Sequence, residues 1–377
     1  MNVYFDNAAT TCVRSEAAEL MLKVMTEDFG NPSSTHSMGR KAKTILETAR
    51  KNVADAIGAS PAEVYFTSGG TESDNWAIFG VCEKHWRKGK HIVISGYEHD
   101  AINSPVKKLE DQGWEITRIM PDSDGHITPE AVSQVVRKDT VLVSVMLVNN
   151  EIGAVNQIAK IVKAVKAKSD ALIHTDAVQA FCKMPVSVKS LGVDLMSLSS
   201  HKIHGPKGCG ALFIKNGVKL PSLIMGGGQE ESLRSGTEAL PAIAGFGEAA
   251  RLGKAEMPKT VEKMRELRAY LKEAITREIP ETVFIGTGDA PHILSISLPK
   301  YKSEVLMNYL DREGICVSKS SACKKGKRSH VLEAMGLAPH IIDGAIRISI
   351  SKFSTIEECE YFVEHLKAAS EKVLKVL

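Results

Sequence analysis

Short apolar runs alternate with longer amphipathic segments along the first half of this chain. Segments 14–28, 38–57 and 158–167 carry apolar residues at helical spacing, which predicts helices. Between them lie short, mostly apolar runs bounded by turn residues. These predict strands at 63–67, 91–95, 114–120, 141–148, 171–175 and 195–199. Strands separated by helices predict an α/β protein with a mostly parallel sheet covered on both faces.

The second half has a different pattern, which starts after a Gly-rich polar loop at 226–237. A long helical region follows over 242–278, and we expect a break near Met257 and Pro258 because proline interrupts helical hydrogen bonding. The remaining patterns predict a smaller α/β domain with elements at 292–298, 302–312, 315–317, 345–350 and from 355 onward.

The chain has 377 residues, enough for a large domain with a smaller one attached. We expect the large domain over 15–255 and a small domain that combines 1–14 with 256–377. Apolar residues make up 43% and charged residues 25%, as in ordinary globular proteins. The net charge is only +3, so composition favours neither direct nucleic-acid binding nor attachment to a membrane surface.

Cysteine usage and the N-terminus indicate the compartment. The seven cysteines are scattered, without the spacing of a disulfide framework or a structural metal site. The N-terminal residues lack the basic and apolar regions of a signal peptide. The longest apolar stretch, 141–148, is too short to span a bilayer. We therefore expect a cytoplasmic protein with no membrane segment and no bound metal.

Two residues suggest a cofactor. Lys202 lies just past a strand pattern, and the glycines and proline after it exclude an immediately following helix. Asp176 ends another apolar run. Pyridoxal phosphate needs this pair, because a lysine amine forms its Schiff base and a carboxylate keeps its pyridine nitrogen protonated. Either residue alone is more simply read as a solvated lysine or a helix cap.

Gly69 and Gly70 stand between the strand predicted at 63–67 and a helix expected from about Trp76. Their N–H groups and the helix dipole would favour an anion, and Thr71 adds a hydroxyl, so this is a candidate phosphate site. It is not a Walker loop, and an ordinary capped helix explains it about as well.

Polar residues follow several predicted strands at the same relative place. In parallel sheets, ligands bind beyond the carboxyl ends of the strands, which meet at one edge. Solvated residues would have no reason to share this placement, so a common site is favoured. The residues are Thr71, His99, Asn150, Asp176 and Lys202.

Together these segments resemble the cysteine desulfurases of the NifS/IscS type, in the class V aminotransferase group of pyridoxal phosphate enzymes. The motifs run nearly end to end and in the same order: YFDNAATT, GNPSSTH, FTSGGTESDN, EHDA, VNNEIG, HTDAVQ, SSHKIHGPKG, RSGTEAL, SSAC and AIRISI. The resemblance implies the type I pyridoxal phosphate enzyme fold, with a seven-stranded, mostly parallel sheet in the large domain.

The resemblance also implies roles at the cofactor. Lys202 would form the Schiff base and shuttle the Cα proton, and Asp176 would pair with the pyridine nitrogen. Gln179 would hydrogen-bond to the phenolic oxygen, and His99 would stack on the ring and serve as an acid/base group. The phosphate would be bound by Gly70, Thr71, Ser199 and His201, and by Thr237 from a neighbouring subunit, which implies a homodimer.

The substrate is implied in the same way to be L-cysteine. Asn150 and Arg347 would hold its carboxylate, Arg347 through the two-pronged contact that a guanidinium makes well. Asn31 would line the pocket. A purely structural role stays open for His99, Asn150 and Thr237.

Cys323 decides between the possible reactions. It lies in SSACKKGKR, among lysines that lower a thiol pKa and raise the thiolate fraction. The resemblance implies that its thiolate attacks the substrate sulfur, keeps it as a persulfide and releases alanine; an incidental exposed cysteine is the alternative. We expect Cys316 to lie in the core. The other cysteines are expected to be non-catalytic: Cys12, Cys82, Cys182, Cys209 and Cys359.

The predicted activity is that of a cysteine desulfurase. Its protein sulfur acceptor would be an iron–sulfur scaffold or a tRNA-thiolation enzyme. The loop after Cys323 is shorter and more basic than in the housekeeping members of the family, so we expect it to suit a particular acceptor. Alternatives are a selenocysteine lyase, which would share the site, and an aminotransferase, which would not need Cys323. A non-catalytic assembly subunit is disfavoured by the complete set Lys202, Asp176, His99 and Cys323.

Overall fold

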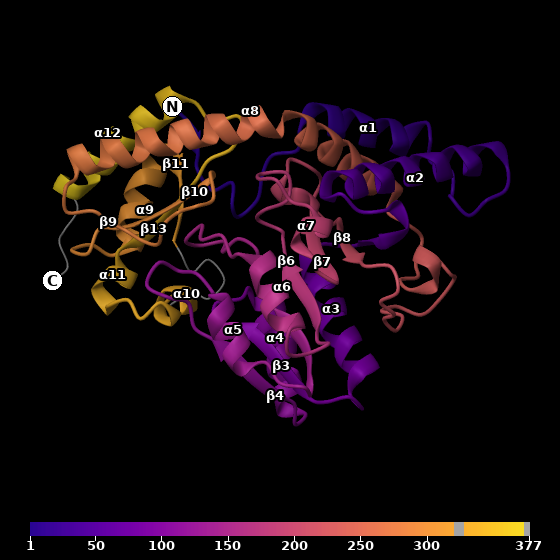
Figure 1. Cartoon of the computed structure of the whole chain (residues 1–377). Helices are drawn as coiled ribbons and strands as arrows, with labels where there is room; N and C mark the ends of the chain where they lie inside the picture. Colours follow the sequence, from indigo (N-terminus) through magenta and orange to yellow (C-terminus); the bar gives the residue numbers. More distant parts are fainter. Residues whose placement is uncertain (320–327, 373–377) are drawn as a thin grey trace.

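The computed structural model describes residues 1–319 and 328–372, and its larger part is built on a seven-stranded sheet (Figure 1). The strand order is β2-β8-β7-β6-β5-β3-β4, and β8 alone among these strands runs opposite to the rest. The predicted mostly parallel sheet of seven strands is confirmed. The strands are β2 (Val64–Thr67), β3 (His91–Ser95), β4 (Glu115–Ile119), β5 (Thr140–Ser144), β6 (Leu172–Asp176), β7 (Leu195–Ser199) and β8 (Gly210–Ile214).

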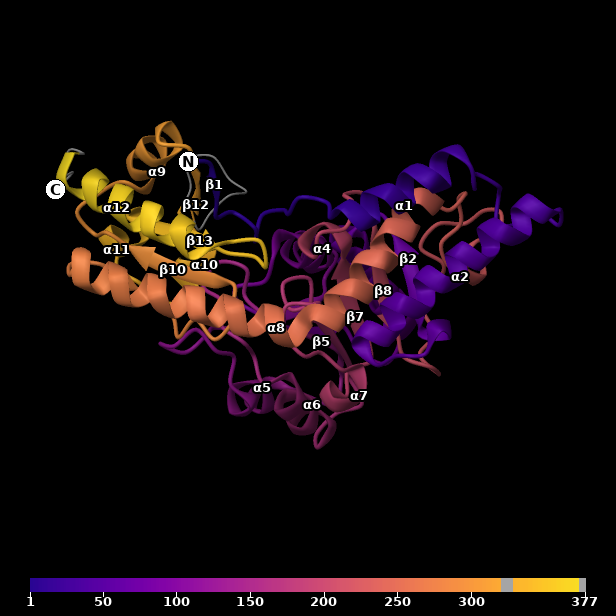
Figure 2. The same ribbon diagram turned by 90° about the horizontal axis from the view of Figure 1, so that it is seen from above.

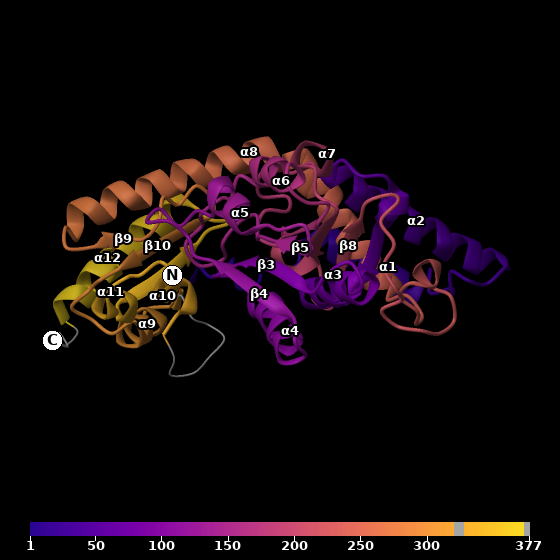
Figure 3. The ribbon, with the colours of Figure 1, turned by 60° about the horizontal axis from the view of Figure 1, so that its bottom comes forward.

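Helices cover both faces of this sheet, because successive strand residues point to opposite sides and both sides are buried. In β3, Ile92 and Ile94 pack with Trp76, whereas Val93 faces a second apolar cluster. Figure 3 shows α4 on one side of the sheet and α5 and α6 on the other. The helices of this part are α1 (Ser15–Thr26), α2 (Ser37–Ile57), α3 (Gly70–His85), α4 (Asp100–Asp111), α5 (Pro129–Val135), α6 (Ile158–Lys166) and α7 (Val188–Leu191), with short 3-10 turns at Pro61–Glu63, Ser200–Lys202 and Glu230–Ser232.

The smaller part is built on an antiparallel sheet in the order β12-β13-β10-β9. Strand β1 (Val3–Tyr4) pairs in parallel with β11 (Ile315–Cys316), so the N-terminus belongs to this part. Phe5 and Phe362 contribute to its own apolar core. Its other elements are β9 (Val283–Phe284), β10 (Ile293–Ser297), β12 (Ser318–Lys319), β13 (Ala345–Ser349), α9 (Ser303–Arg312), α10 (His330–Ala334), α11 (Pro339–Asp343) and α12 (Ile356–Lys372).

Helix α8 (Leu240–Glu278) runs unbroken along both parts, as Figure 2 shows. The break predicted near Met257 and Pro258 is wrong, because Pro258 lies inside the helix. An internal proline costs a helix about 3 kcal/mol. Burial on either side of it offsets this loss, since Ala250 packs in the larger core and Met264 in the smaller one.

Two local expectations are also corrected. Helix α3 begins at Gly70 rather than near Trp76, because the N–H of Ser73 already donates to the carbonyl oxygen of Gly69 at 3.2 Å. Cys316 is exposed rather than in the core, because alternation along β11 turns Ile315 inward and Cys316 outward.

The division into domains at residues 14 and 255 stays a prediction; residue 255 lies within α8. Across residues 1–319 and 328–372, no helix has both the length and the apolar character that crossing a bilayer requires.

Candidate active site at the carboxyl edge of the sheet

The polar residues predicted to share a site follow strand ends that lie at one edge of the large sheet. Strands β2, β3, β5, β6 and β7 point the same way, so their carboxyl ends are neighbours. Thr67 at the end of β2 and Ser199 at the end of β7 both pair with Gly210 of β8. Residues at or just beyond these strand ends are Thr71, His99, Asn150, Asp176 and Lys202.

Lys202 closes the 3-10 turn that follows β7. Its Nζ donates to the carbonyl oxygens of Ala8 and Ala9, each at 2.6 Å. Both carbonyls belong to the segment that joins β1 to α1. The amine is therefore held at the sheet edge by backbone groups instead of extending into solvent.

Asp176 ends β6 and is buried. Its Oδ1 accepts a hydrogen bond from the N–H of Val178 at 2.8 Å. Burial raises the pKa of the Asp176 carboxyl, and the Val178 N–H, His99 and Lys202 oppose that rise. A carboxylate in such a place favours a cationic partner that replaces the stabilisation lost from water, such as a protonated ring nitrogen.

His99 caps helix α4, and its Nδ1 accepts a hydrogen bond from the N–H of Ala101 at 3.1 Å. Because Nδ1 is an acceptor, the neutral ring carries its proton on Nε2. The neighbouring Glu98 is fully buried, and this burial raises the pKa of its carboxyl to about 8. His99 also lowers the pKa of the Asp176 carboxyl, so the two side chains lie near enough to contact one ligand.

A cavity of about 350 Å³ opens at the N-terminus of α3, lined by residues that include Thr10, Gly70, Thr71, Ser199 and His201. The Oγ of Ser199 is buried and has no hydrogen-bond partner within the described part of the chain. At Gly70, a Cβ atom would lie 2.9 Å from a methyl group of Val178, so only glycine fits without movement. A hydroxyl in need of a partner and a helix N-terminus are what a phosphate requires, so the residues present fit this group.

His201 lines the same cavity, with its Nδ1 3.1 Å from the Oγ1 of Thr10. Burial, Lys202 and Lys207 together lower the pKa of His201 to about 4. The ring is therefore neutral near pH 7 and can contribute hydrogen bonds rather than charge.

Gln179 is buried one turn beyond Asp176, and its Nε2 donates to the carbonyl oxygen of Ala8 at 2.8 Å. Its Oε1 accepts from the Nζ of Lys183 at 3.2 Å and lies 3.4 Å from the Nε2 of His292. The sequence motifs point to Gln179 but to neither Lys183 nor His292. The one signal for Lys183 is its helical spacing, four residues after Gln179.

Arg347 projects from β13 of the smaller sheet and is buried. Its Nη1 donates to the carbonyl oxygen of Asn150 at 2.8 Å, and its Nη2 donates to a carboxylate oxygen of Asp6, also at 2.8 Å. The structure thus joins the two residues predicted to hold the substrate carboxylate, and adds Asp6 to them.

Two predicted site residues lie in other surroundings. Asn31 is exposed, and its Oδ1 accepts from the N–H of Ser33 in its own loop at 2.9 Å. Thr237 is exposed and lines a separate hollow of about 250 Å³ with Arg234. Their roles stay predictions. Cys323 lies outside the described residues.

Comparison with known proteins gives consistent matches over nearly the whole chain. The model of the aminotransferase class-V family matches residues 3–362. A cysteine desulfurase IscS of Methanosarcina thermophila is 43% identical, covering 96% of this chain and 90% of the relative. One of Dictyoglomus turgidum is 42% identical, covering 98% and 95%. A solved NifS-like protein superposes with a TM-score of 0.93 at 38% identity, covering 98% of this chain and all of its own.

Proposed function

The chain belongs to the aminotransferase class-V family, and on this premise we propose that it is a pyridoxal phosphate-dependent cysteine desulfurase. It converts L-cysteine to L-alanine and transfers the sulfur to an acceptor. The observation that carries the proposal is that Lys202, Asp176 and the cavity at the N-terminus of α3 lie at one sheet edge, in a chain similar to cysteine desulfurases over nearly its full length.

The residues at the sheet edge fit pyridoxal 5'-phosphate. Lys202 would hold its aldehyde carbon, Asp176 its ring nitrogen and Gln179 its phenolic oxygen, while His99 would stack on the ring. Bound there, the cofactor supplies an electron sink for negative charge that develops on the substrate Cα. The phosphate would be held by Gly70, Thr71, Ser199 and His201.

The side chains around the cofactor site would bind the substrate and transfer protons. Arg347 and Asn150 bind the carboxylate of L-cysteine and so fix its orientation. The Nζ of Lys202, which lies at the carbonyl oxygens of Ala8 and Ala9, would in its neutral form take the Cα proton. The Nε2–H of His99 can donate a proton on the substrate side.

Sulfur transfer is assigned to Cys323. Its thiolate attacks the substrate sulfur, so an S–S bond forms, the substrate C–S bond breaks and the electron pair of that bond stays on carbon. Protonation of that carbon and return of the Cα proton from Lys202 give alanine, and the persulfide remains on Cys323. The lysines beside Cys323 favour its thiolate. Cys316 is exposed, but partial burial, Asp311 and Asp6 raise the pKa of its thiol, which disfavours the same role.

We further propose a cytoplasmic homodimer in which the partner subunit's Thr237 completes the phosphate site. The acceptor of the persulfide sulfur would be a protein, either an iron–sulfur scaffold or a tRNA-thiolation enzyme, without direct binding of nucleic acid. The basic residues after Cys323 suit an acidic face on that protein.

The test is product release from L-cysteine with a reductant, measured together with the visible absorbance of the cofactor. Wild type should release alanine and sulfide in equal amounts. Cys323→Ala should keep the absorbance and lose turnover, whereas the matched control Cys316→Ala should keep both. Full activity of Cys323→Ala would contradict the persulfide role and favour a lyase that acts directly on its substrate.

A further inference from the structure

Lys183 is a buried lysine that the proposed reaction does not use. Only 8% of it is exposed, and its Nζ donates to the neutral amide oxygen of Gln179 rather than to a carboxylate. Burial, Lys202 and Arg347 lower the pKa of Lys183 well below its usual range. Burying an amine is costly, so its place beside the Lys202 site calls for a specific role.

Contacts with Ala8, Lys183 and His292 together determine which way the Gln179 amide points. The carbonyl oxygen of Ala8 only accepts, so the end of the Gln179 amide that contacts it is the NH2 group, and the end that contacts Lys183 is the oxygen. The Nε2 of His292 approaches the same oxygen and must carry the proton. The opposite end, the NH2 group, donates to the carbonyl oxygen of Ala8, which also accepts from Lys202. The amide N–H groups therefore face the Lys202 side.

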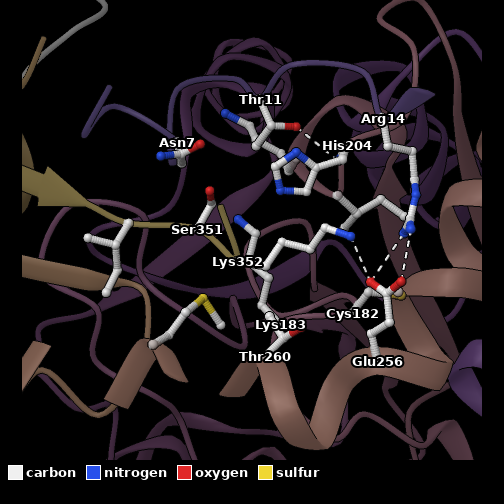
Figure 4. Close-up of a pocket in the computed structure, with 15 residues that line it drawn as sticks. Asn7, Thr11, Arg14, Cys182, Lys183, His204, Glu256, Thr260, Ser351 and Lys352 are labelled. Carbon is white, nitrogen blue, oxygen red and sulfur yellow. Dashed lines mark hydrogen bonds and ion pairs between the residues drawn. The ribbon is translucent and has the colours of Figure 1, made fainter. Parts of the chain in front are cut away.

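The surroundings of Lys183 also supply a matched control. A small cavity of about 30 Å³ is lined by Lys183, Lys202, Glu256 and Lys352 among others (Figure 4). It has room for about one or two water molecules. Lys352 lines the same cavity, but its Nζ donates to Glu256 at 2.7 Å and not to Gln179.

We propose that Lys183 is a positioning residue for the cofactor. With His292, it holds Gln179 so that an amide N–H, and not the amide oxygen, faces the phenolic oxygen of pyridoxal phosphate. This inference rests on the proposed function. A donor at that oxygen stabilises its negative charge and so lowers the pH at which the proton shared with the Lys202 nitrogen is lost. Without Lys183 one of the contacts that hold this orientation is lost, the amide can turn more readily, and that pH rises.

The experiment is a pH titration of the visible absorbance of the holoenzyme. Lys183→Met keeps the side-chain length but removes the donor, so its midpoint should rise by about one unit. Lys352→Met should leave the midpoint unchanged. Gln179→Leu alone should raise the midpoint, and adding Lys183→Met to it should raise it no further, because residues that act through one another are not additive.

A wild-type midpoint in Lys183→Met, or full additivity with Gln179→Leu, would overturn the inference. If Lys183→Met does not fold, as judged by circular dichroism, His292→Phe removes the other donor to the same oxygen. It should shift the midpoint in the same direction, and an unchanged midpoint would again overturn the inference. A wild-type protein that shows no cofactor absorbance at all would instead contradict the proposed function.

Discussion

The guanidinium of Arg347 and the carboxylate of Asp6, 341 residues apart in the chain, form an ion pair at 2.8 Å. A second N–H group of Arg347 binds the backbone of Asn150. The Nε is buried and has no partner within the described residues, and the two contacts use only two of the five N–H donors, so donors remain for a substrate. The smaller sheet thus presents a fixed guanidinium to the edge of the larger one.

Arg347→Lys should raise the KM for L-cysteine by about tenfold or more, because lysine keeps the charge but loses the planar fork. The cofactor absorbance should stay as in wild type. Alanine release against cysteine concentration measures the effect. Arg14→Lys is the control, since Arg14 is equally buried but pairs with Glu256 at 2.9 Å. An unchanged KM in Arg347→Lys would show that Arg347 does not bind the carboxylate of the substrate.

His99→Asn separates catalysis from stability. Asparagine is a good helix cap, so it should replace the Nδ1 contact to the N–H of Ala101 and leave the melting temperature nearly unchanged. Loss of the imidazole should lower kcat by roughly 10²- to 10⁴-fold. Thermal unfolding and steady-state kinetics on one preparation measure both. A kcat close to wild type would show that His99 acts only as the N-cap of α4.

Gly70→Ala should weaken cofactor binding by about tenfold or more, because the added methyl group meets Val178 and lies 3.6 Å from the Cβ of Ser199. Titration of the apoprotein with pyridoxal phosphate, followed by absorbance, gives the affinity. Gly80→Ala lies on the same helix, where a Cβ makes ordinary contacts of 3.4 Å or more, and should bind as wild type does. Equal affinities of the two variants would place the phosphate elsewhere.

Glu151 makes stability depend on pH. Its carboxyl is buried and accepts from the Oγ of Ser329, and burial raises its pKa from 4.5 to about 7. Because the pKa of Glu151 is higher in the folded than in the unfolded chain, its carboxyl stabilises the fold at pH values below the unfolded-state pKa. This stabilisation is lost as the pH rises through the folded-state pKa of about 7.

Glu151→Gln should therefore remove a decline of roughly 3 kcal/mol in the free energy of unfolding between about pH 5 and pH 8. Urea unfolding across this range measures it. Glu266→Gln, a substitution at an exposed position on α8, should retain the decline. A Glu151→Gln curve parallel to that of wild type would show that the carboxyl does not titrate in this range.

The sequence alone determined six of the seven strands of the large sheet, without β8, and the polar residues that follow several of them. The pattern at 91–95 predicts a strand, and β3 has those bounds. Asp176 likewise ends β6, and Lys202 closes the turn that follows β7. These features follow from short periodic patterns and turn residues, which act within a few positions of the chain. Parallel pairing then brings the strand ends to one edge.

The tertiary structure decided what depends on partners far apart in the chain. Pro258 stays helical because α8 packs on two cores, and Cys316 turns outward because of how β11 is placed. Lys183 reads in sequence as one more lysine, and only burial beside Gln179 gives it a role. Strand β8 likewise requires two neighbours, β2 and β7. Burial and pairing between residues far apart in the chain decide which conformation has the lower free energy at each of these places. No short stretch of sequence carries that information.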